Sequence, residues 1–369
     1  MRALERGELD ADDSALSYHL DRCLGCRGCE PVCPSGVQYG QGLEAARARI
    51  AAAQGTPRLA RLALWALTTS GISGVVYWFA RLLRSVLPRS VAGWGRIRFA
   101  LGMLAATKPH RRAAVGVRGR SPFNAARDTP HAVQIFRGCV MQGLFAHVHD
   151  ATARTLAVNG YATREVPGQG CCGALHAHAG LIDEARALAR SNIAAFGGGA
   201  EPIVVNSAGC GALLKAYGHL LGDERAERFA ARVRDVTEQL GPAPVAGAPL
   251  DLHVAYDPPC HLLHAQGVAA APLKLFAAIP LLELVQVPGA AECCGSAGLF
   301  TLLEPEMSRA VLAPKLAGLR AAAPQVVATG NPGCLMQLGA GLAAAQIPAQ
   351  VRHPVELLDD AYWAAGRYE

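Results

Sequence analysis

The 369-residue sequence predicts an α/β protein in which a small N-terminal cluster domain, ferredoxin-like or helical, precedes two homologous α/β modules. After residue 130, short β-branched runs alternate with Ala- and Leu-rich stretches, which is the pattern of α/β units. The cysteines in this part recur at offsets of 121, 122 and 124 residues, which indicates an internal repeat. Four closely spaced cysteines lie near the N-terminus, followed by a helix expected over residues 41–53. We place the domains at residues 1–53, 54–130, 131–245 and 250–360.

The cysteines set the first constraint on function. The chain has twelve of them, while its 51% hydrophobic content is enough to build a sizeable core without covalent cross-links. The N-terminus, Met1 to Arg6, is followed by acidic and polar residues, so we expect no secretory signal and a cytoplasmic location. Disulfides are rare in that compartment, and closely spaced cysteines there indicate metal or redox chemistry.

The N-terminal cysteine run fits the pattern C-x2-C-x2-C-x3-C-P. Thiolates at this spacing wrap a loop around one face of an iron–sulfur cubane, and the following Pro34 turns the chain away. Zinc prefers two well-separated cysteine pairs, so zinc and inert cysteines are the weaker alternatives. In two-cluster ferredoxins the fourth cysteine binds the other cluster, so Cys33 either closes its own cluster or is the remnant of such an arrangement. The run predicts a [4Fe–4S] cluster with the ligands Cys23, Cys26, Cys29 and Cys33.

Each α/β module carries four cysteines in matching positions, with spacings C-x31-CC-x37-C and C-x32-CC-x39-C. The first cysteine of each module follows a strand-like run, and ligands of α/β sheets gather at the carboxyl ends of strands. A glycine after each Cys-Cys pair allows close backbone approach. We predict one metal or redox site per module, with buried core cysteines as the alternative. The eight candidate ligands are Cys139, Cys171, Cys172, Cys210, Cys260, Cys293, Cys294 and Cys334.

Four histidines lie close to the module cysteines in the sequence. We interpret them as hydrogen-bonded or solvent-facing side chains rather than as ligands. They are His176, His178, His261 and His264.

A basic segment separates the N-terminal domain from the modules. Between Ala45 and Ala126 there are fourteen cationic and no acidic side chains, in a chain whose net charge is +6. Residues 62–80 are uncharged and flanked by arginines, and a polar linker is expected near residues 116–130. For residues 58–120 three interpretations stay open: a soluble helical pair, peripheral membrane contact, and a membrane span. Nucleic-acid binding is disfavoured because the cations alternate with long apolar stretches.

Several sequence strings together carry a resemblance to a known family. They lie at residues 19–24, 33–40, 170–175, 257–262 and 293–298. From residue 19 to residue 359 the chain resembles the glycolate oxidase iron–sulfur subunit family, which shares its Cys-Cys-Gly modules with the heterodisulfide reductases. The resemblance implies a subunit that passes electrons from a flavin-containing partner, which oxidises glycolate or another 2-hydroxy acid, toward a membrane or quinone acceptor.

The sequence departs from the family pattern in two places. The family has two ferredoxin runs, and this chain matches only the second, so a start assigned too far downstream and a genuine loss are both open. The reductase-type module ends in C-x-x-C, whereas Ser207 and Asn331 stand at the first of these two positions here. Each module then offers four thiolates, which disfavours a non-cubane cluster with five cysteine ligands. Four thiolates are enough for an ordinary cubane, and a scaffold without a cluster is the alternative. The case for disulfide reductase chemistry is weakened accordingly.

The sequence therefore predicts an electron-transfer subunit with no catalytic residue of its own. It has no G-x-G-x-x-G dinucleotide signature and no recognisable flavin site, so hydroxy-acid oxidation is expected on a flavin-containing partner. The alternatives are a disulfide reductase-type subunit acting at a Cys-Cys-Gly cluster, a lactate utilisation iron–sulfur protein, and a metal-stabilised scaffold without a redox role.

Overall fold

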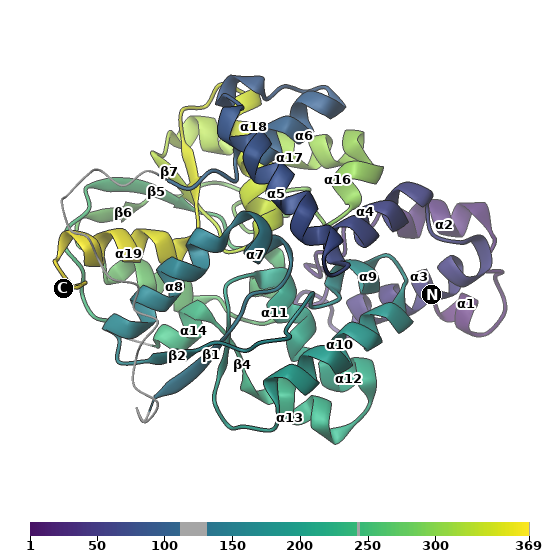
Figure 1. Ribbon diagram of the computed structural model, residues 1–369. Coiled ribbons are helices and arrows are strands. Elements are labelled where there is room, and N and C mark those ends of the chain that lie inside the picture. The colour runs from purple at the N-terminus through teal and green to yellow at the C-terminus, as the bar shows by residue number, and fades with distance from the viewer. Residues whose placement is uncertain (111–130, 242–243, 369) are drawn as a thin grey trace.

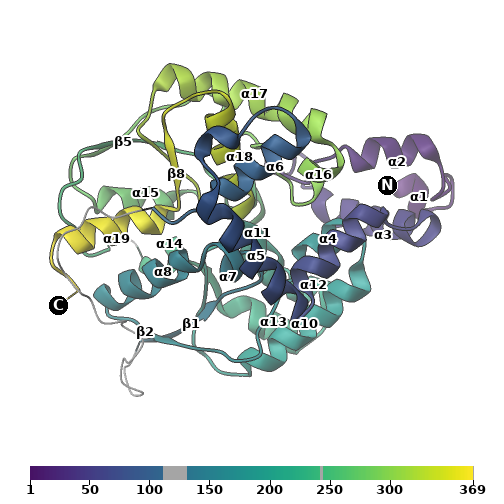
Figure 2. The same cartoon turned by 45° about the horizontal axis from the view of Figure 1, so that its top comes forward.

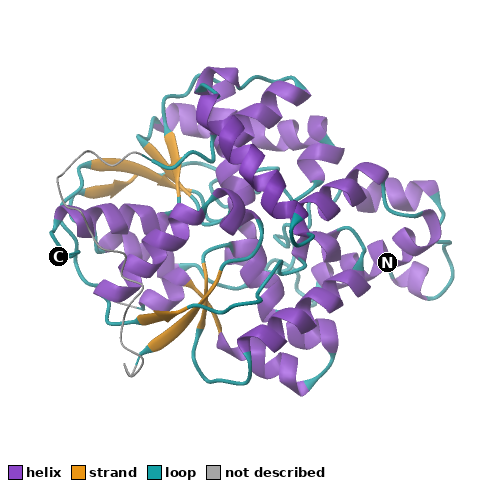
Figure 3. Ribbon diagram, in the orientation of Figure 1, coloured by secondary structure: helices purple, strands orange, loops and turns teal. Residues whose placement is uncertain are grey.

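The computed structural model describes residues 1–110, 131–241 and 244–368 (Figure 1). The N-terminal helices form one end of the molecule, and the C-terminus lies at the opposite end. The strands form two separate groups, with helices between and around them (Figure 3). The predicted α/β class, with a helical N-terminal region and two sheets, is confirmed.

The N-terminal region is helical on both sides of the cysteine run. Helix α2 begins after Asp13, whose carboxylate accepts a hydrogen bond from the Leu16 N–H at 2.9 Å. The helix expected over residues 41–53 is present as part of α3. The helices are α1 (Arg2–Glu5), α2 (Ser14–Asp21) and α3 (Tyr39–Gln54). Together they bury a small apolar core formed by Leu4, Leu20, Leu43, Ala46 and Ile50.

The basic segment folds into short helices: α4 (Arg58–Thr68), α5 (Ile72–Val86), the 3-10 turn η1 (Arg89–Val91) and α6 (Arg96–Ala105). The chain turns at Gly71, which has a φ of 81°, and α4 and α5 meet at 91°. Residues 62–80 therefore do not form one straight helix. Among the described residues no single helix is long and apolar enough to cross a membrane, whereas α4 and α5 together pass that test of length and composition. The expected linker at 116–130 lies outside the described residues.

The first module is a parallel sheet with the strand order β2-β1-β3-β4. Parallel strands require crossover connections, which the helices of this module provide. Its strands are β1 (Ala132–Phe136), β2 (Ala162–Arg164), β3 (Ile203–Val205) and β4 (Val233–Asp235). Its helices are α7 (Val140–Leu144), α8 (Ala146–Val158), α9 (Ala174–His178), α10 (Ile182–Phe196), α11 (Ala208–Lys215), α12 (Tyr217–Leu221), α13 (Glu224–Arg232) and α14 (Val236–Leu240).

The second module repeats this topology with the order β6-β5-β7-β8, again all parallel. Its strands are β5 (Leu252–Tyr256), β6 (Leu282–Leu284), β7 (Val326–Ala328) and β8 (Gln350–Arg352). Its helices are α15 (Ala270–Ala277), α16 (Phe300–Leu303), α17 (Pro305–Ala322), α18 (Pro332–Ala344) and α19 (Pro354–Ala364), with the π-helical turn η2 (His261–Ala265). The identical strand order confirms the predicted duplication.

The two modules pack against each other through one shared core. Helix α8 lies along α19, where the Arg154 guanidinium donates from Nε and Nη2 to the two carboxylate oxygens of Asp359 at 2.8 and 2.7 Å. Val133 of β1 and Val254 of β5 belong to the same buried cluster. The basic segment lies across both modules, with α5 contacting α7 and α6 contacting α18 (Figure 2).

Candidate metal centre

The four cysteines of the first module meet at the carboxyl ends of β1 and β3. Cys139 follows β1, Cys210 lies in the first turn of α11 after β3, and the Cys171–Cys172 pair comes from the loop between β2 and α9. The chain leaves β1 toward β2 on one side and returns as β3 on the other, which opens a crevice at this switch point. The Sγ atoms of Cys139 and Cys171 are 3.5 Å apart, and those of Cys172 and Cys210 are 3.2 Å apart.

Gly173 shapes the Cys-Cys-Gly turn of this module. Its φ of 90° lies in the left-handed region, and a Cβ added there would lie 3.2 Å from the Ala185 backbone. The turn directs the Gly173 N–H toward the Sγ of Cys171 at 3.4 Å and the Ala174 N–H toward the Sγ of Cys172 at 3.5 Å. Hydrogen bonds of this kind tune the reduction potential of iron–sulfur clusters.

The second module builds the same arrangement. Cys260 precedes η2, Cys334 lies in the first turns of α18, and Gly295 has a φ of 83°. The Gly295 N–H donates to the Sγ of Cys293 at 3.4 Å. A Cβ at Gly295 would overlap the Ser308 carbonyl oxygen, so only glycine fits this turn.

The first cysteine of each Cys-Cys pair is the favoured thiolate. Hydrogen bonds from Cys139 and then Cys172 hold the pKa of Cys171 well below its usual range. Hydrogen bonds from the neighbouring cysteine thiols, Cys260 first, lower the pKa of Cys293 to about 3. Because metals bind the thiolate, both modules have a sulfur ready to bind one.

The N-terminal cysteine run forms a compact loop held by its own polar contacts. The Gly25 N–H points at the Sγ of Cys23 at 3.5 Å. The Arg27 Nε donates to the Glu30 carboxylate at 3.0 Å, and the same oxygen accepts a hydrogen bond from the Gly40 N–H at 2.7 Å. The Arg27–Glu30 ion pair and the bond from Gly40 at the start of α3 fix the loop between α2 and α3.

This loop lies against the second module. The His261 Nε2 is 3.0 Å from the Gly25 carbonyl oxygen, and a Cβ on Gly28 would lie 3.5 Å from the His264 ring. The pKa of the Cys26 thiol is raised, chiefly by burial and in part by the charge of Cys293. The N-terminal cysteines and those of the second module are therefore close enough to interact electrostatically.

Arg47 on α3 ties the same loop to the first module. Its guanidinium donates to the carbonyl oxygens of Leu20 at 2.9 Å, Cys23 at 2.7 Å and His178 at 3.2 Å. Sequence reasoning missed this residue, because nothing distinguishes it from the other cations of the basic segment.

All eight module cysteines open into one cavity of about 850 Å³. The carboxyl ends of both sheets therefore face the same space, and the predicted site of each module lies on its wall. Cys23 of the N-terminal loop is the ninth cysteine on the wall. The nine are Cys23, Cys139, Cys171, Cys172, Cys210, Cys260, Cys293, Cys294 and Cys334.

The donor set fits iron–sulfur clusters. The ligands are thiolates, which are the usual ligands of these clusters, and backbone N–H groups already point at three module sulfurs. Among the described residues, no three His, Cys, Asp or Glu side chains are gathered as they would be around a single metal ion. The rest of the cavity wall is largely apolar and includes Leu67, Met103, Met141, Leu175, Leu299, Phe300, Leu303 and Met336.

The positions that depart from the C-x-x-C pattern also line the cavity. Ser207 and Asn331 stand at the starts of α11 and α18. The Asn331 Oδ1 accepts a hydrogen bond from the Gly209 N–H at 3.1 Å, and its Nδ2 lies 3.5 Å from the Sγ of Cys334. Asn331 therefore links the two modules at the point where the reductase pattern has a further cysteine.

The four histidines set aside as non-ligands have different surroundings. The His178 Nδ1 lies 3.2 Å from a Glu44 carboxylate oxygen, and His261 contacts the Gly25 carbonyl. His176 is buried, and its contact with Cys171 helps to lower the pKa of that thiol. His261 in the second module likewise helps to lower the pKa of the Cys293 thiol, through its charge.

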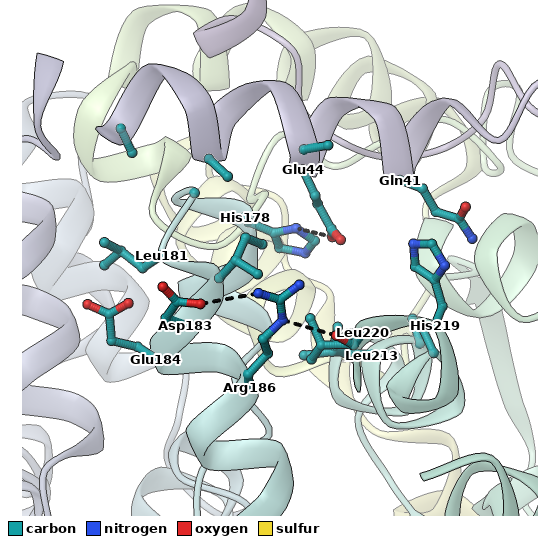
Figure 4. A pocket seen from close by; sticks show the side chains of 18 of the residues that line it. Gln41, Glu44, His178, Leu181, Asp183, Glu184, Arg186, Leu213, His219 and Leu220 are labelled. Atoms are coloured by element: carbon teal, nitrogen blue, oxygen red, sulfur yellow. Dashed lines mark hydrogen bonds and ion pairs between the residues drawn. The ribbon is translucent and has the colours of Figure 1, made fainter. Parts of the chain in front are cut away.

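A second pocket of about 580 Å³ lies on the outer side of this wall (Figure 4). In this pocket Glu44 contacts His178, and Asp183 forms an ion pair with Arg186. His178 and His261 line both spaces, so they separate this pocket from the cysteine cavity.

Comparisons with known proteins agree with the duplicated architecture. The cysteine-rich domain (CCG) matches residues 133–215 and 254–339. The chain is 33% identical over 393 aligned positions to the probable glycolate oxidase iron-sulfur subunit of Bacillus subtilis, covering 99% of this chain and 86% of that protein. It is 29% identical over 361 positions to the glycolate oxidase iron-sulfur subunit of Escherichia coli, covering 93% and 82%. Lactate utilization protein A of Geobacillus kaustophilus is 30% identical over 235 positions, covering 62% of this chain and 98% of that protein.

Proposed function

This chain belongs to the glycolate oxidase iron–sulfur subunit family, and we propose that it is the electron-transfer subunit of a complex that oxidises a 2-hydroxy acid on another subunit. Glycolate is the substrate class that the family suggests. In this proposal a flavin-containing partner carries out the oxidation, and this chain passes the electrons toward a membrane or quinone acceptor.

The observation that carries the proposal is the position of the N-terminal cysteine loop. The loop is docked on η2 through the contact between His261 and Gly25, and Cys26 lies within electrostatic range of Cys293. Cys23 shares a cavity wall with the eight module cysteines. These contacts support a series of cluster ligands from the surface loop to the interior, which is the arrangement that an electron-transfer subunit requires.

We assign Cys23, Cys26, Cys29 and Cys33 as ligands of a [4Fe–4S] cluster, and the module cysteines as ligands of further iron–sulfur clusters. When bound, such clusters accept and donate single electrons. The protein's own contribution is to position the sulfurs and direct N–H groups at them. The exposure of Cys29 supports this loop as the part of the chain that a partner subunit approaches.

The relatives named for lactate utilization leave the hydroxy acid open between glycolate and lactate. The assembled complex should be assayed with both acids under the same conditions. Faster reduction of the acceptor with lactate than with glycolate would assign the chain to a lactate-oxidising complex.

Replacing Cys23 with serine tests the proposal directly. We expect Cys23→Ser to lose about four irons per chain and to abolish electron transfer by the assembled complex. The flavin partner should keep its activity with an artificial dye, because the dye takes electrons upstream of this chain. Ser35→Ala, in the same loop, is the control and should keep both iron and activity.

Two results would contradict the proposal. Loss of the dye-linked activity in Cys23→Ser would show that the loop takes part in substrate oxidation or assembly rather than in transfer alone. An unchanged iron content together with full activity would remove Cys23 from the ligand set.

A further inference from the structure

The paired helices α4 and α5 present an apolar face that no other described element covers. On α5 the exposed apolar residues are spaced as one helical stripe, and three more lie on α4. They are Val75, Trp78, Phe79, Leu82 and Val86 on α5, and Leu59, Leu62 and Trp65 on α4, each between 48 and 73% exposed. Figures 1 and 2 both show α5 at the front of the molecule. We call this set the hairpin face. A continuous apolar face of this kind marks an interaction site.

The opposite side of the hairpin is firmly anchored. The Tyr77 ring packs on Gly143, and its hydroxyl donates to the Leu67 carbonyl at 3.2 Å. The Arg84 guanidinium donates to the carbonyl oxygens of Thr107 and Leu144, both at 2.6 Å. The outward direction of the hairpin face is therefore fixed by the packing of α5 on the first module.

The surroundings of the hairpin face are cationic. Residues 45–110 contain no Asp or Glu. Six exposed arginines lie on these helices or on the segment that follows them: three on α4 and α5, one in η1 and two on α6, which contacts α5. No ion pair within the described ranges involves any of them. They are Arg58, Arg61, Arg81, Arg89, Arg96 and Arg98. An apolar, Trp-containing stripe bordered by these arginines is complementary to a surface that combines acyl chains with negative headgroups.

We propose that the hairpin face is a docking surface for an anionic lipid bilayer. Trp65 and Trp78 lie at the depth of the headgroups, the apolar stripe of α5 enters the acyl boundary, and the arginines contact lipid phosphates. The 91° bend between α4 and α5 lets both helices lie in the plane of the membrane.

Docking would also orient the metal centre. Residues of α4, among them Ala60 and Leu67, line the cysteine cavity from the side opposite the hairpin face. The helix that contacts lipid would thus form one wall of the cavity, and the candidate ligands would lie directly beneath the membrane surface. A lipid-soluble electron acceptor would then be within reach of this subunit.

Vesicle sedimentation with the intact iron-containing protein tests the proposal. We expect binding to vesicles that contain phosphatidylglycerol and much weaker binding to pure phosphatidylcholine. The double variant Trp78→Asp/Val86→Asp should weaken binding by about tenfold or more, because it places charge in the acyl boundary. Arg61→Gln and Arg81→Gln should each weaken it by about fivefold and reduce its salt dependence.

Two controls separate lipid docking from loss of structure. Leu273→Asp alters an exposed leucine of α15, away from the hairpin face, and should bind vesicles like the wild type. Every variant should keep the iron content of the wild type, so failure of this proposal is distinguishable from failure of the proposed function. Absence of wild-type binding to anionic vesicles would overturn the proposal. Loss of assembly with the other subunits in the Trp78→Asp/Val86→Asp variant, with vesicle binding unchanged, would show instead that the face binds protein.

Discussion

The two modules share strand order and ligand positions but differ in the buried polar groups behind the ligands. In the first module the network is neutral: the Asn192 side chain donates to the Cys171 carbonyl at 2.8 Å, and the Tyr217 hydroxyl donates to the Cys172 carbonyl at 2.7 Å. In the second module the position that corresponds to Asn192 by the repeat offset, 123 residues later, is Lys315. Lys315 forms a buried ion pair with Asp257.

This difference shows which parts of the duplicated unit could change. The cysteines and the glycine turns are the same in both copies, as we expect if each copy holds the cluster that we propose. The buried polar residues behind them only need hydrogen-bond or ion-pair partners, so an amide network and an ion pair both meet this requirement. The N-terminal loop contacts both copies, through His261 of the second module and through the bond from Arg47 to the His178 carbonyl of the first.

The largest effect is expected when the buried ion pair of the second module is broken. Burial opposes the charged form of Lys315, but the adjacent Asp257 outweighs it and holds the pKa of Lys315 above its usual value. Lys315→Met would leave the Asp257 carboxylate buried with Thr329 as its remaining hydrogen-bond donor, at a cost of about 3–5 kcal/mol in unfolding free energy.

Chemical denaturation of the anaerobic protein would measure this cost. The double variant Asp257→Asn/Lys315→Met should recover most of the lost stability, because no unpaired charge remains. If the single and double variants were equally unstable, packing rather than charge would explain the loss.

A pH-dependent difference is expected between the residues that cap α14 and α19. Asp235 caps α14 of the first module and His353 caps α19 of the second, each as part of a capping box. Burial raises the pKa of Asp235 to about 6 and lowers the pKa of His353 to about 3. Between pH 4 and 6 the unfolded Asp235 loses its proton first, so its contribution to stability falls as pH rises. Between pH 6.5 and 3 the unfolded His353 gains a proton first, so its contribution falls as pH falls.

Thermal unfolding measured across this pH range would distinguish the contribution of Asp235 in the first module from that of His353 in the second. Asp235→Asn should gain stability over the wild type as pH rises from 4 to 6, by about 3 kcal/mol at most. His353→Gln should gain stability relative to the wild type as pH falls below 6.5. Parallel pH profiles for both variants and the wild type would show that neither cap titrates in this way.

The smallest effect is expected in the neutral network of the first module. Asn192→Ala removes the acceptor of the Gly170 N–H and the donor to the Cys171 carbonyl, which should cost about 1–3 kcal/mol. The same denaturation assay measures it, with exposed Arg190→Ala on the same helix as a control. A loss as large as that of Lys315→Met would remove the distinction drawn between the two modules.

Much of this architecture could be predicted from local sequence patterns. The spacing of Cys139, Cys171 and Cys210 and its repetition in the second half indicated two equivalent α/β units, because ligand spacing and strand periodicity depend on neighbouring residues. Asp257 also stood in one of the strings that carried the resemblance. Its partner Lys315 gave no signal, because it is a single lysine within a helix and becomes special only through burial.

The sequence by itself determined which residues are candidate ligands, that there are two homologous modules, and that one segment is cationic. The tertiary structure decided that both modules face one cavity, that the N-terminal loop docks on the second of them, and that the uncharged run of the basic segment bends into two helices. Contacts such as Arg154 with Asp359 and Gly25 with His261 join residues 205 and 236 positions apart. Pairings at such separations depend on how the elements pack, and no local pattern in the chain records them.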